Sequence, residues 1–371
     1  MDSKKKILFI LHIPPPVHGS SIVGKQIMDS KLINSYFDTE YINLGTSKKV
    51  SDIGGLGFKK IISYAKILFL VLKKLTTNKY DSVYLAPTIS NLGFYKDLPV
   101  ALIIQIFNKK NLYHLHNKGV SNRNKNSVTN FLHRLFFRNT TIILLSKLLY
   151  KDVAEFVSEE NIYICPNGVG VISNLDKELQ DKPVNKVVTI LFLSNLIQSK
   201  GVLVLLDACK ILNEKGVAFK CLFVGGEGDI TEDEFINKIE SYKLNDKVYY
   251  LGKKYDKEKH NVFLNADIFA FPTFYYNECF PLVTLEAMQY ALPIISSNEG
   301  GIPDIVKNDF NGFIVPRKKS AELAKKMITL IKDEELRKTL GKNGREMFLN
   351  EYTSEKFEAK LLEILIKIAE K

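Results

Sequence analysis

The chain has 371 residues, of which 46% are hydrophobic, and it carries a formal net charge of +11 at pH 7. This length exceeds that of one ordinary domain and predicts two domains, each with a core of its own. The 4 scattered cysteines include no CxxC pair, which excludes a disulfide framework and indicates a reducing compartment. We recognise no signal peptide and no apolar run of the roughly 20 residues that a membrane-spanning helix needs.

The positive charge is concentrated in the first half of the chain. Residues 1–175 hold 23 lysines and arginines against 11 acidic residues, whereas residues 176–371 hold 29 against 30. Two explanations stay open. The first half has an acidic partner such as anionic lipid, a phosphorylated carrier or nucleic acid, or it has a lysine-rich solvated surface.

Short β-branched and aromatic runs alternate with segments of helical period, which predicts βαβ units and parallel sheets. A polar segment rich in helix breakers, residues 172–186, predicts the linker between a domain at 1–173 and a domain at 187–353. We therefore expect two doubly wound, Rossmann-like α/β domains facing a cleft. The expected strands are residues 6–11, 82–86, 111–115, 141–145, 162–165, 187–193, 219–224, 248–251, 268–271, 293–296 and 313–315.

The last segment predicts a helix that begins at Thr353 or Ser354. Its apolar residues recur at helical spacing and form one stripe, which must be buried against another element. We expect residues 354–371 to cross back and pack on the first domain. The stripe consists of Phe357, Leu361, Ile364, Leu365 and Ile368.

Two segments of the first half have the pattern of a helix at a membrane surface. Residues 59–75 are apolar in the middle and flanked by lysines, and residues 131–138 interleave bulky apolar side chains with Arg134 and Arg138. Such helices can lie in the interface of an anionic leaflet. The alternative is a core-facing helix with solvated lysines.

The stretch from Glu278 to Met288 places Glu278 and Glu286 around the predicted start of a helix. Apolar strands precede and follow it, so this acidic loop lies at the carboxyl edge of a parallel sheet, where α/β proteins bind ligands. The unpaired amides of the first helical turn, near Pro281 and Leu282, can hold a phosphate. Glutamates on either side could bind hydroxyls of the molecule that carries this phosphate. The pattern predicts a sugar-nucleotide site.

Other loops at predicted strand ends could complete this site. Lys200 precedes Gly201 after the strand at 187–193, where a cation would neutralise a diphosphate; the alternative is a solvated lysine. The glycines of residues 225–228 permit close backbone approach, or they form a tight turn.

In the first half, Gly19 stands between a strand and a helix, as in a phosphate-binding loop, although a rigid connector is the alternative. His114 and His116 share a face at the end of another strand, where they are ligand-binding or structural.

Several classes of site are not expected. The chain has no HExxH motif and no Asp-x-Asp pair at a strand end, so we expect no metal and no cofactor. The absence of a GxGxxG motif disfavours a nicotinamide dehydrogenase. A nucleic-acid partner would explain the basic half but not the paired glutamates, so we expect none.

Several motifs in chain order together resemble glycosyltransferase family 4, a retaining group with the GT-B fold. The resemblance covers most of the chain and is strongest over residues 187–316. The motifs are Pro166-Asn167-Gly168-Val169, Ser199-Lys200-Gly201, the glycines of residues 225–228, Glu278 and Glu286 followed by Ala287-Met288, and Gly300-Gly301-Ile302-Pro303-Asp304.

The resemblance implies roles for the residues already named. Lys200 would bind the diphosphate, Glu278 would contact the donor sugar and stabilise the reacting centre, and Glu286 would bind the ribose hydroxyls. Gly19 would close over the donor, and His116, or otherwise His114, would contact donor sugar or acceptor. Asn195 stands where an arginine is common, so the diphosphate site lacks one cation. The backbone of four further residues would face sugar and phosphate: Cys279, Phe280, Pro281 and Leu282.

The resemblance implies a retaining, metal-independent hexosyl- or N-acetylhexosaminyltransferase that uses a nucleotide-diphosphate sugar, such as a UDP-sugar. The acceptor would be a cell-surface polysaccharide or a lipid-linked glycan such as one on polyprenyl diphosphate. The protein would be cytoplasmic, either free or peripheral at the inner face of the membrane. Two alternatives stay open: a sugar-nucleotide epimerase or hydrolase without an acceptor, and a catalytically weak nucleotide-binding subunit.

Overall fold

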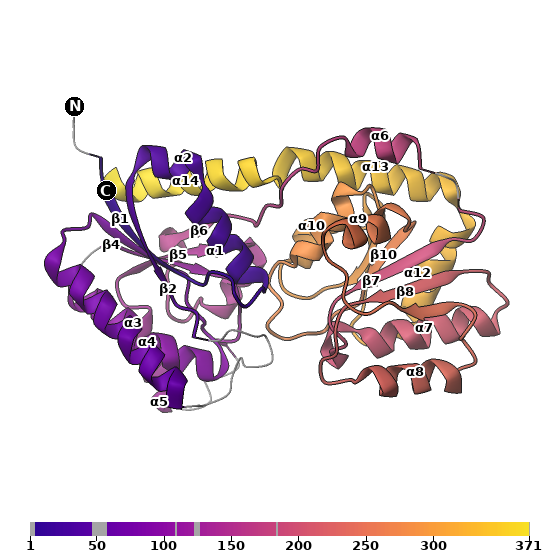
Figure 1. Ribbon diagram of the computed structural model, residues 1–371, viewed down its shortest axis with the longest axis horizontal. Coiled ribbons are helices and arrows are strands. Elements are labelled where there is room, and N and C mark those ends of the chain that lie inside the picture. Colours follow the sequence, from indigo (N-terminus) through magenta and orange to yellow (C-terminus); the bar gives the residue numbers. More distant parts are fainter. Residues whose placement is uncertain (1–3, 47–57, 108–109, 122–126, 183–184, 371) are drawn as a thin grey trace. The chain divides into compact units, whose positions relative to one another are not determined.

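The computed structural model describes residues 4–46, 58–107, 110–121, 127–182 and 185–370. The chain forms two compact units (Figure 1): unit 1 is Met1–Asn167 with Ser354–Lys371, and unit 2 is Gly168–Thr353. The segment that we predicted as a linker, 172–186, belongs to unit 2 and contains helix α6 (Leu175–Gln180). In this helix Asp176 is ion-paired with Arg345 at 2.7 Å and Leu175 is buried, which attaches α6 to unit 2. Residues 183–184 of the predicted linker lie outside the described residues.

Unit 1 is a parallel sheet with the strand order β2-β1-β3-β4-β5-β6. Five of its strands were predicted to within one residue at each end. Strand β2 was missed because it is a half-polar edge strand in which only Ile42 is buried. The strands are β1 (Lys6–Leu11), β2 (Asp38–Asn43), β3 (Ser82–Leu85), β4 (Lys110–Leu115), β5 (Thr140–Leu144) and β6 (Ile162–Ile164).

Helices cover both faces of this sheet. Helices α3, α4 and α5 pack in a row on one face, and α1, α2 and α14 lie on the other (Figure 1). The helices are α1 (Gly19–Asp29), α2 (Lys31–Tyr36), α3 (Phe58–Thr77), α4 (Asn91–Ile106), α5 (Ser127–Phe136), α14 (Ser354–Glu370) and the 3-10 helices η2 (Lys147–Asp152) and η3 (Glu159–Asn161).

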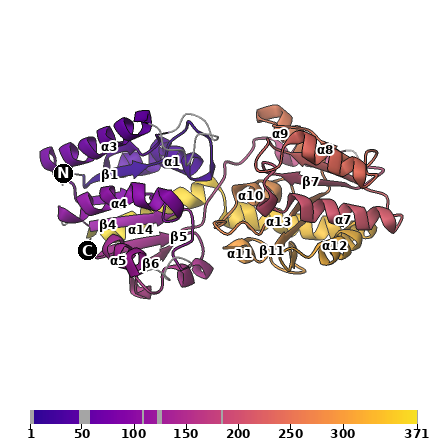
Figure 2. The same ribbon diagram turned by 90° about the horizontal axis from the view of Figure 1, so that it is seen from below.

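Helix α14 returns to unit 1, as predicted from its apolar stripe (Figure 1, Figure 2). All the stripe residues are at most 5% exposed. Its Glu358 accepts a 2.5 Å hydrogen bond from Ser30, and its Ala369 carbonyl accepts one from Lys110 at 3.4 Å. Burial of each such Leu, Ile or Phe contributes about 1.5–3 kcal/mol, so α14 is a substantial part of the unit 1 core.

Unit 2 is a second parallel sheet, with the strand order β12-β11-β10-β7-β8-β9. All of its strands were predicted from the sequence. They are β7 (Thr189–Leu193), β8 (Lys220–Val224), β9 (Val248–Tyr250), β10 (Ile268–Phe271), β11 (Ile294–Ser297) and β12 (Gly312–Val315).

The helices of unit 2 also cover both faces of its sheet: α7 packs on α12, and α10 packs on α13. They are α6 (Leu175–Gln180), α7 (Val202–Glu214), α8 (Glu232–Ser241), α9 (Asp256–Leu264), α10 (Leu282–Gln289), α11 (Ile302–Ile305), α12 (Ser320–Lys332), α13 (Glu334–Glu351) and the 3-10 helix η4 (Gln198–Lys200).

The strand orders show where each sheet is able to bind a ligand. In unit 2 the chain runs outward from β7 to β8 and β9, then returns to the other side of β7 as β10. In unit 1 it runs from β1 to β2 and returns as β3. Because successive connections diverge at such a point, the carboxyl ends of the two central strands form a crevice. The candidate positions are therefore β7/β10 and β1/β3.

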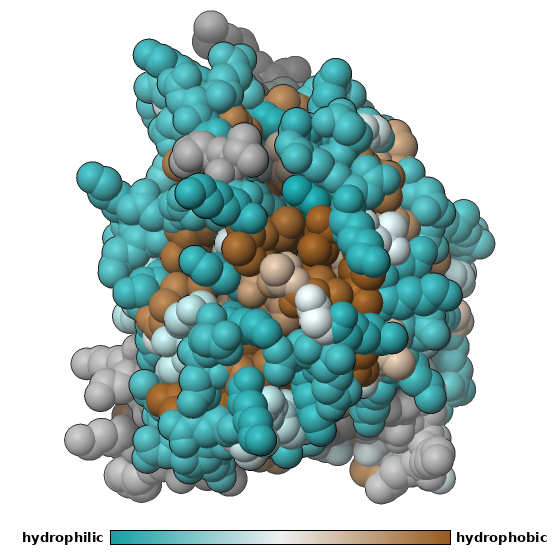
Figure 3. Space-filling model, turned by 90° about the vertical axis from the view of Figure 1, so that its right-hand side faces the viewer, coloured by the Kyte–Doolittle hydropathy of each residue, from teal (hydrophilic) through white to brown (hydrophobic). Residues whose placement is uncertain are grey.

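The surface has apolar areas as well as charged ones. Figure 3 looks onto unit 2 and shows hydrophobic residues gathered in the middle of that face, inside a hydrophilic rim. Within the described part of the chain, no helix is both long and apolar enough to cross a membrane.

Candidate functional site

The loops that follow β7 and β10 are joined at the carboxyl edge of the unit 2 sheet. The carbonyl oxygen of Ser199 accepts hydrogen bonds from the Phe274 amide at 2.7 Å and from the Thr273 hydroxyl at 3.3 Å. Gly201 has a φ of +90°, and a Cβ there would lie 2.3 Å from the carbonyl oxygen of Pro272. Only glycine fits this approach, so the neighbouring Lys200 is held at the sheet edge.

Lys200 and Glu278 form an ion pair at this edge. Their Nζ and Oε2 atoms are 2.6 Å apart, and the side chains are 18% and 10% exposed. The Lys200 ammonium also lies 4.5 Å from the centre of the Tyr275 ring, a cation–π contact that fixes it further. The structure thus brings together two residues that the sequence placed in separate motifs.

The second glutamate is also ion-paired. Glu286, on α10, lies 2.6 Å from Nζ of Lys259 on α9, and each side chain is about a third exposed, at 27% and 30%. Next to Lys259, His260 contacts Tyr290 at 2.8 Å and Glu178 at 2.6 Å. These contacts fix α9 against α10. Lys259 was not predicted as a site residue.

Helix α10 begins at Leu282, with Pro281 at its N-cap and no hydrogen bond from a capping side chain. The hydroxyl of Thr284, in the first turn, is buried without a hydrogen-bond partner among the described residues. Cys279 and Phe280 are 3% and 4% exposed, so their side chains belong to the core and their backbone leads into the helix. The end of α10 therefore offers amides, with the positive end of its dipole, to an anion.

Asn195 links two loops of unit 2. Its Oδ1 accepts a hydrogen bond from the Gly226 amide at 3.1 Å, and the Gly226 carbonyl accepts one from the Leu196 amide at 2.7 Å. Gly225 has a φ of +151°, and a Cβ there would lie 1.9 Å from the Ser194 carbonyl oxygen. The glycines of residues 225–228 thus permit the close approach of a neighbouring loop of the protein, the loop after β7.

In unit 1, His114 and His116 lie at the end of β4. His114 is fully buried and 2.5 Å from the Tyr84 hydroxyl, which gives it a structural role. His116 stacks near it with a ring separation of 4.2 Å, and its Nδ1 has no hydrogen-bond partner in the described ranges. Burial, with the nearby His18, lowers the pKa of His116 to about 4, so it is neutral at pH 7.

Gly19 is the first residue of α1. His18 is the N-cap: its Nδ1 accepts from the Ser21 amide at 3.3 Å, and Ser21 Oγ accepts from the His18 amide at 2.9 Å. A Cβ on Gly19 would meet no atom within 4 Å, so packing in unit 1 does not require a glycine there.

A polar cluster in unit 1 was not predicted. Asp97 is fully buried, accepts from the Thr88 amide at 2.8 Å, and lies 3.2 Å from Lys96 and 4.0 Å from His12. Burial raises the pKa of Asp97, and burial with the Lys96 charge lowers the pKa of His12 to about 3. The one available signal was the place of His12 directly after β1. The fold thus gathers His12, His18 and His116 at the carboxyl edge of this sheet.

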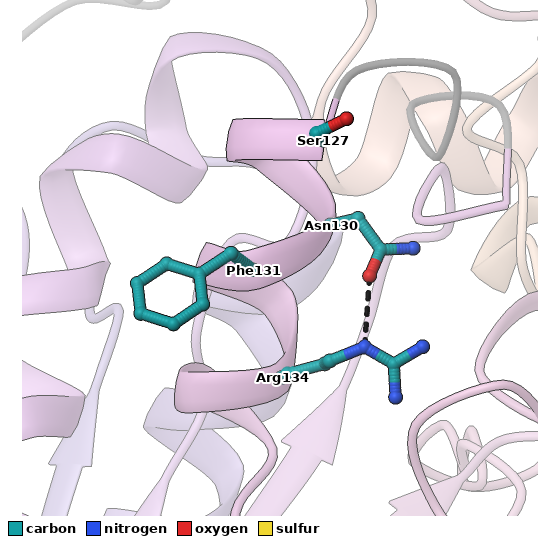
Figure 4. A pocket seen from close by; sticks show the side chains of 4 residues that line it. All are labelled: Ser127, Asn130, Phe131 and Arg134. Carbon is teal, nitrogen blue, oxygen red and sulfur yellow. Dashed lines mark hydrogen bonds between the residues drawn. The ribbon is translucent and has the colours of Figure 1, made fainter.

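A shallow hollow of about 350 Å³ lies on α5, lined by Ser127, Asn130, Phe131 and Arg134 (Figure 4). Nε of Arg134 donates to Asn130 at 2.9 Å, and its Nη2 lies 3.3 Å from Glu155. The hollow is part of the outer surface of α5. No group of three or more His, Cys, Asp and Glu side chains that could hold a metal lies within the described ranges.

Comparison with known proteins relates unit 2 to a large enzyme family. Residues 176–347 match the family model described as Glycosyl transferases group 1. A capsular polysaccharide biosynthesis glycosyltransferase of Staphylococcus aureus is 31% identical over 233 residues, 59% of either chain. An amylovoran biosynthesis glycosyltransferase of Erwinia amylovora is 29% identical over 54% of this chain and 50% of its own. The chain thus spans between half and three fifths of the length of these relatives.

Solved structures match nearly the whole chain. Sucrose-phosphate synthase from Thermosynechococcus elongatus superposes with a TM-score of 0.75 at 17% identity and covers 98% of this chain and 99% of its own. Anabaena HepE, solved with UDP and glucose, gives 0.71 at 21% identity and covers 97% and 99%. At these identities the likeness shows the fold, and the predicted two-domain α/β fold of GT-B type is confirmed.

Proposed function

We propose that this protein is a glycosyltransferase of family 4 that moves a sugar from a nucleotide-diphosphate donor to a glycan acceptor. The observation that carries the proposal is the Lys200–Glu278 ion pair, which lies at the carboxyl edge of the unit 2 sheet. Lys200 follows β7 and Glu278 precedes α10, so the pair lies where the chain reverses direction across the sheet. Ligands of α/β proteins bind at this position. The family match of residues 176–347 and the names of the relatives support the same activity.

The donor binds to unit 2 through its charged and hydroxyl groups. Lys200 and the amides at the start of α10 hold the diphosphate, because a cation and a helix N-terminus both stabilise negative charge. Glu286 accepts hydrogen bonds from the ribose hydroxyls. UDP is our choice of nucleotide, since the structurally similar HepE was solved with it.

Ligand binding would change the partners of both glutamates. Glu278 is 2.6 Å from Lys200, and Glu286 is 2.6 Å from Lys259. When a diphosphate takes up the Lys200 ammonium, the Glu278 carboxylate becomes able to accept hydrogen bonds from donor sugar hydroxyls. The ion pairs therefore hold the glutamates in place until the donor replaces their partners.

The reaction retains the anomeric configuration and needs no metal. Lys200 and the α10 amides stabilise the charge that develops on the departing nucleoside diphosphate, which is the largest catalytic contribution available here. The acceptor hydroxyl attacks from the face that the diphosphate leaves, so positioning replaces a protein nucleophile. The bond from the anomeric carbon to the diphosphate breaks, the bond to the acceptor oxygen forms, and the diphosphate takes the acceptor proton.

Unit 1 binds the acceptor, a growing surface polysaccharide or a glycan on a polyprenyl diphosphate. His116 is neutral at pH 7, and its Nδ1 is able to accept a hydrogen bond from a sugar hydroxyl. Gly19, beside the His18 cap, leaves room for a ligand at the start of α1. The polysaccharide acceptor is supported by the names of the relatives in Staphylococcus aureus and Erwinia amylovora.

We also propose peripheral contact between unit 1 and the inner, anionic face of a membrane, with the protein otherwise cytoplasmic. Large apolar side chains are exposed along the outer helices of unit 1, which carries a large positive net charge. Apolar insertion and charge attraction add up at such a surface. The exposed side chains are Ile61, Ile62, Phe69, Leu70 and Leu72 on α3, Leu92, Tyr95 and Ile106 on α4, and Val128 and Phe131 on α5.

Vesicle sedimentation tests the membrane contact. Phe69 is 68% exposed, and Phe69→Asp should weaken binding to vesicles of phosphatidylcholine with phosphatidylglycerol by about tenfold, since a charge replaces an inserted ring. The matched control is Ile236→Asp on α8 of unit 2, which should bind as the wild type does. Equal binding by Phe69→Asp would exclude α3 as the contact surface.

A panel of nucleotide sugars tests the transferase. A saturating donor should raise the melting temperature, because a ligand at 100 times its Kd stabilises the native state by about 2.7 kcal/mol. The donor that binds is then incubated with a lipid-linked glycan, and transfer is followed by mass. If no nucleotide sugar shifts the melting temperature, the proposal is wrong. Donor turnover without acceptor would favour the epimerase or hydrolase, and binding without turnover the non-catalytic subunit.

A further inference from the structure

Of the lysines at the carboxyl edge of the unit 2 sheet, three lie near the proposed donor site or its loops and differ in their partners: Lys200, Lys253 and Lys259. Lys200 is paired with Glu278 and Lys259 with Glu286, both at 2.6 Å. Lys253, in the loop after β9, is exposed and forms no ion pair within the described ranges. Its charge is therefore the one of these three that no carboxylate neutralises.

The loop after β9 turns so that Lys253 lies over the neighbouring glycine loop. The amide of Leu251 donates to the carbonyl of Phe223, and the amide of Gly225 donates to the carbonyl of Gly252, both at 2.9 Å. Gly252 then takes a φ of +64°, a left-handed conformation that favours glycine and redirects the chain. A Cβ on Gly226 would lie 2.1 Å from Cε of Lys253, so this side chain lies directly against Gly226.

Gly226 lies between Lys253 and Asn195, a residue of the proposed donor site. Its other side faces Asn195, whose Oδ1 accepts from the Gly226 amide at 3.1 Å, and its carbonyl is bound by the Leu196 amide. The loops after β7, β8 and β9 are thus connected at a single glycine. The Lys253 side chain and the neutral Asn195 side chain lie on this shared connection, on the same sheet edge as Lys200.

The two ion pairs of the proposed donor site do not supply the positive charge that a bound diphosphate needs. A nucleoside diphosphate carries more than one negative charge, but the Lys200–Glu278 and Lys259–Glu286 pairs add no net positive charge. Burying an anion without a compensating cation is costly. Asn195 is neutral, so it does not supply the cation.

We propose that Lys253 supplies this net positive charge by contacting the phosphates of the donor nucleotide. The inference rests on the proposed function, since it concerns the same donor site. Lys253 has a long, flexible stem and an exposed head, so its ammonium can follow the phosphates as they bind and leave. It is a binding residue that compensates within this chain for the neutral side chain at position 195.

Isothermal titration of UDP, GDP and uridine tests this inference. Lys253→Met should weaken binding of the nucleoside diphosphate by about 5- to 20-fold at 50 mM salt, and less at 300 mM, because salt screens an exposed charge. Binding of uridine, which has no phosphate, should change less than twofold. The matched control is Lys254→Met, since Lys254 is adjacent but paired with Glu258 at 2.9 Å, and it should bind as the wild type does.

A second variant separates charge from packing. Asn195→Arg in the Lys253→Met background should restore most of the lost affinity, whereas it should not if Lys253 only supports the loop. Equal diphosphate affinity in Lys253→Met and Lys254→Met overturns the inference while the proposed function stands. An equal loss for UDP and uridine also overturns it. If the wild type binds neither UDP nor GDP, the proposed function and the inference both fail.

Discussion

The two units have the same architecture, but the polar side chains at the carboxyl edge of their sheets differ in charge. Unit 1 holds 27 lysines and arginines against 15 acidic residues, and unit 2 holds 25 against 26. Yet the basic unit presents partly buried, neutral histidines, His12 and His116, at its candidate edge. The neutral unit presents two lysine–glutamate pairs there. Net charge and site chemistry are therefore separate properties of a unit.

The difference gives the two sheet edges different capacities for binding a ligand. Paired charges such as Lys200–Glu278 can exchange partners with a diphosphate, so they suit an ionic ligand. A neutral imidazole such as that of His116 accepts or donates one hydrogen bond, so it suits a hydroxyl. Substitutions at the sheet edge of unit 2 should therefore affect anion binding, and substitutions at the sheet edge of unit 1 should affect stability in acid.

The largest expected effect is in unit 2. Lys200→Met should lower the rate of sugar transfer by about 100- to 1000-fold, because one preorganised charge is typically worth that much in a transition state. The measurement is the turnover of the donor found in the nucleotide-sugar panel. The control is Lys210→Met on α7, an exposed lysine near Glu214, which should keep the wild-type rate. A loss below tenfold in Lys200→Met would remove this lysine from the catalytic assignment.

The second effect concerns acid and belongs to unit 1. An unfolded histidine takes up its proton near pH 6.5, whereas His116 in the folded protein does so only near pH 4. The unfolded state binds more protons between these values, so the stability is complete above pH 6.5 and decreases as the pH falls through 4. The shift corresponds to roughly 3 kcal/mol of unfolding free energy.

Hydrogen exchange at pH 7 and pH 4.5 measures this effect separately in each unit. Peptides from β1 and β4 should lose protection at the lower pH more than peptides from β7 and β10. His116→Asn should reduce the loss in unit 1, since asparagine does not titrate. Equal losses in both units would show that the buried histidines do not control acid stability.

The third effect is on nucleotide affinity. Glu286→Gln should weaken UDP binding by about tenfold, because a charged acceptor for the ribose hydroxyls is replaced by a neutral one. The same variant should bind 2′,3′-dideoxy-UDP nearly as the wild type does, since that analogue has no hydroxyl to donate. This analogue also controls for the charge of Lys259, which loses its ionic partner in the variant. An equal loss for both nucleotides would contradict the ribose assignment.

The smallest effect compares the helix caps of the two units. Thr231 caps α8 and Glu234 closes the capping box, while His18 and Ser21 do the same for α1. Thr231→Ala should cost about 1 kcal/mol. In unit 2 this lowers the melting temperature by about 2–4 °C, and Thr231→Ser should restore it. No change in Thr231→Ala would mean that α8 frays without affecting the unit.

Strand patterns and loop motifs made much of the fold predictable. Buried parallel strands such as β1 and β10 are continuous apolar runs, whereas the edge strand β2 has a single buried residue, Ile42, and no such signal. The predicted linker contains helix α6, in which the polar residue Asp176 is ion-paired with Arg345 of unit 2. Composition alone does not distinguish a solvated segment from one whose charges are paired.

The positions of the candidate site residues could be predicted from the sequence where they follow strands of a parallel sheet. Such positions meet at one edge of a parallel sheet, so Lys200, Glu278 and Glu286 could be placed near one another. The ion pairs that Glu278 and Glu286 form could not be predicted from the sequence, because the direction of a side chain depends on packing. Lys259 lies in a helix whose sequence gives no sign that it reaches α10. Asp97 becomes notable only because the fold buries it completely.

The return of α14 to unit 1 determines when each unit can fold during synthesis. The sheet of unit 1 is translated before unit 2, but α14, which covers Cys165 and packs on α2, is translated after it. Unit 2 is continuous from Gly168 to Thr353 and can complete its core while unit 1 still exposes the apolar surface that awaits Phe357 and Leu361. Of these two units, the one whose sheet is translated first is therefore the one that can complete its core only after the other.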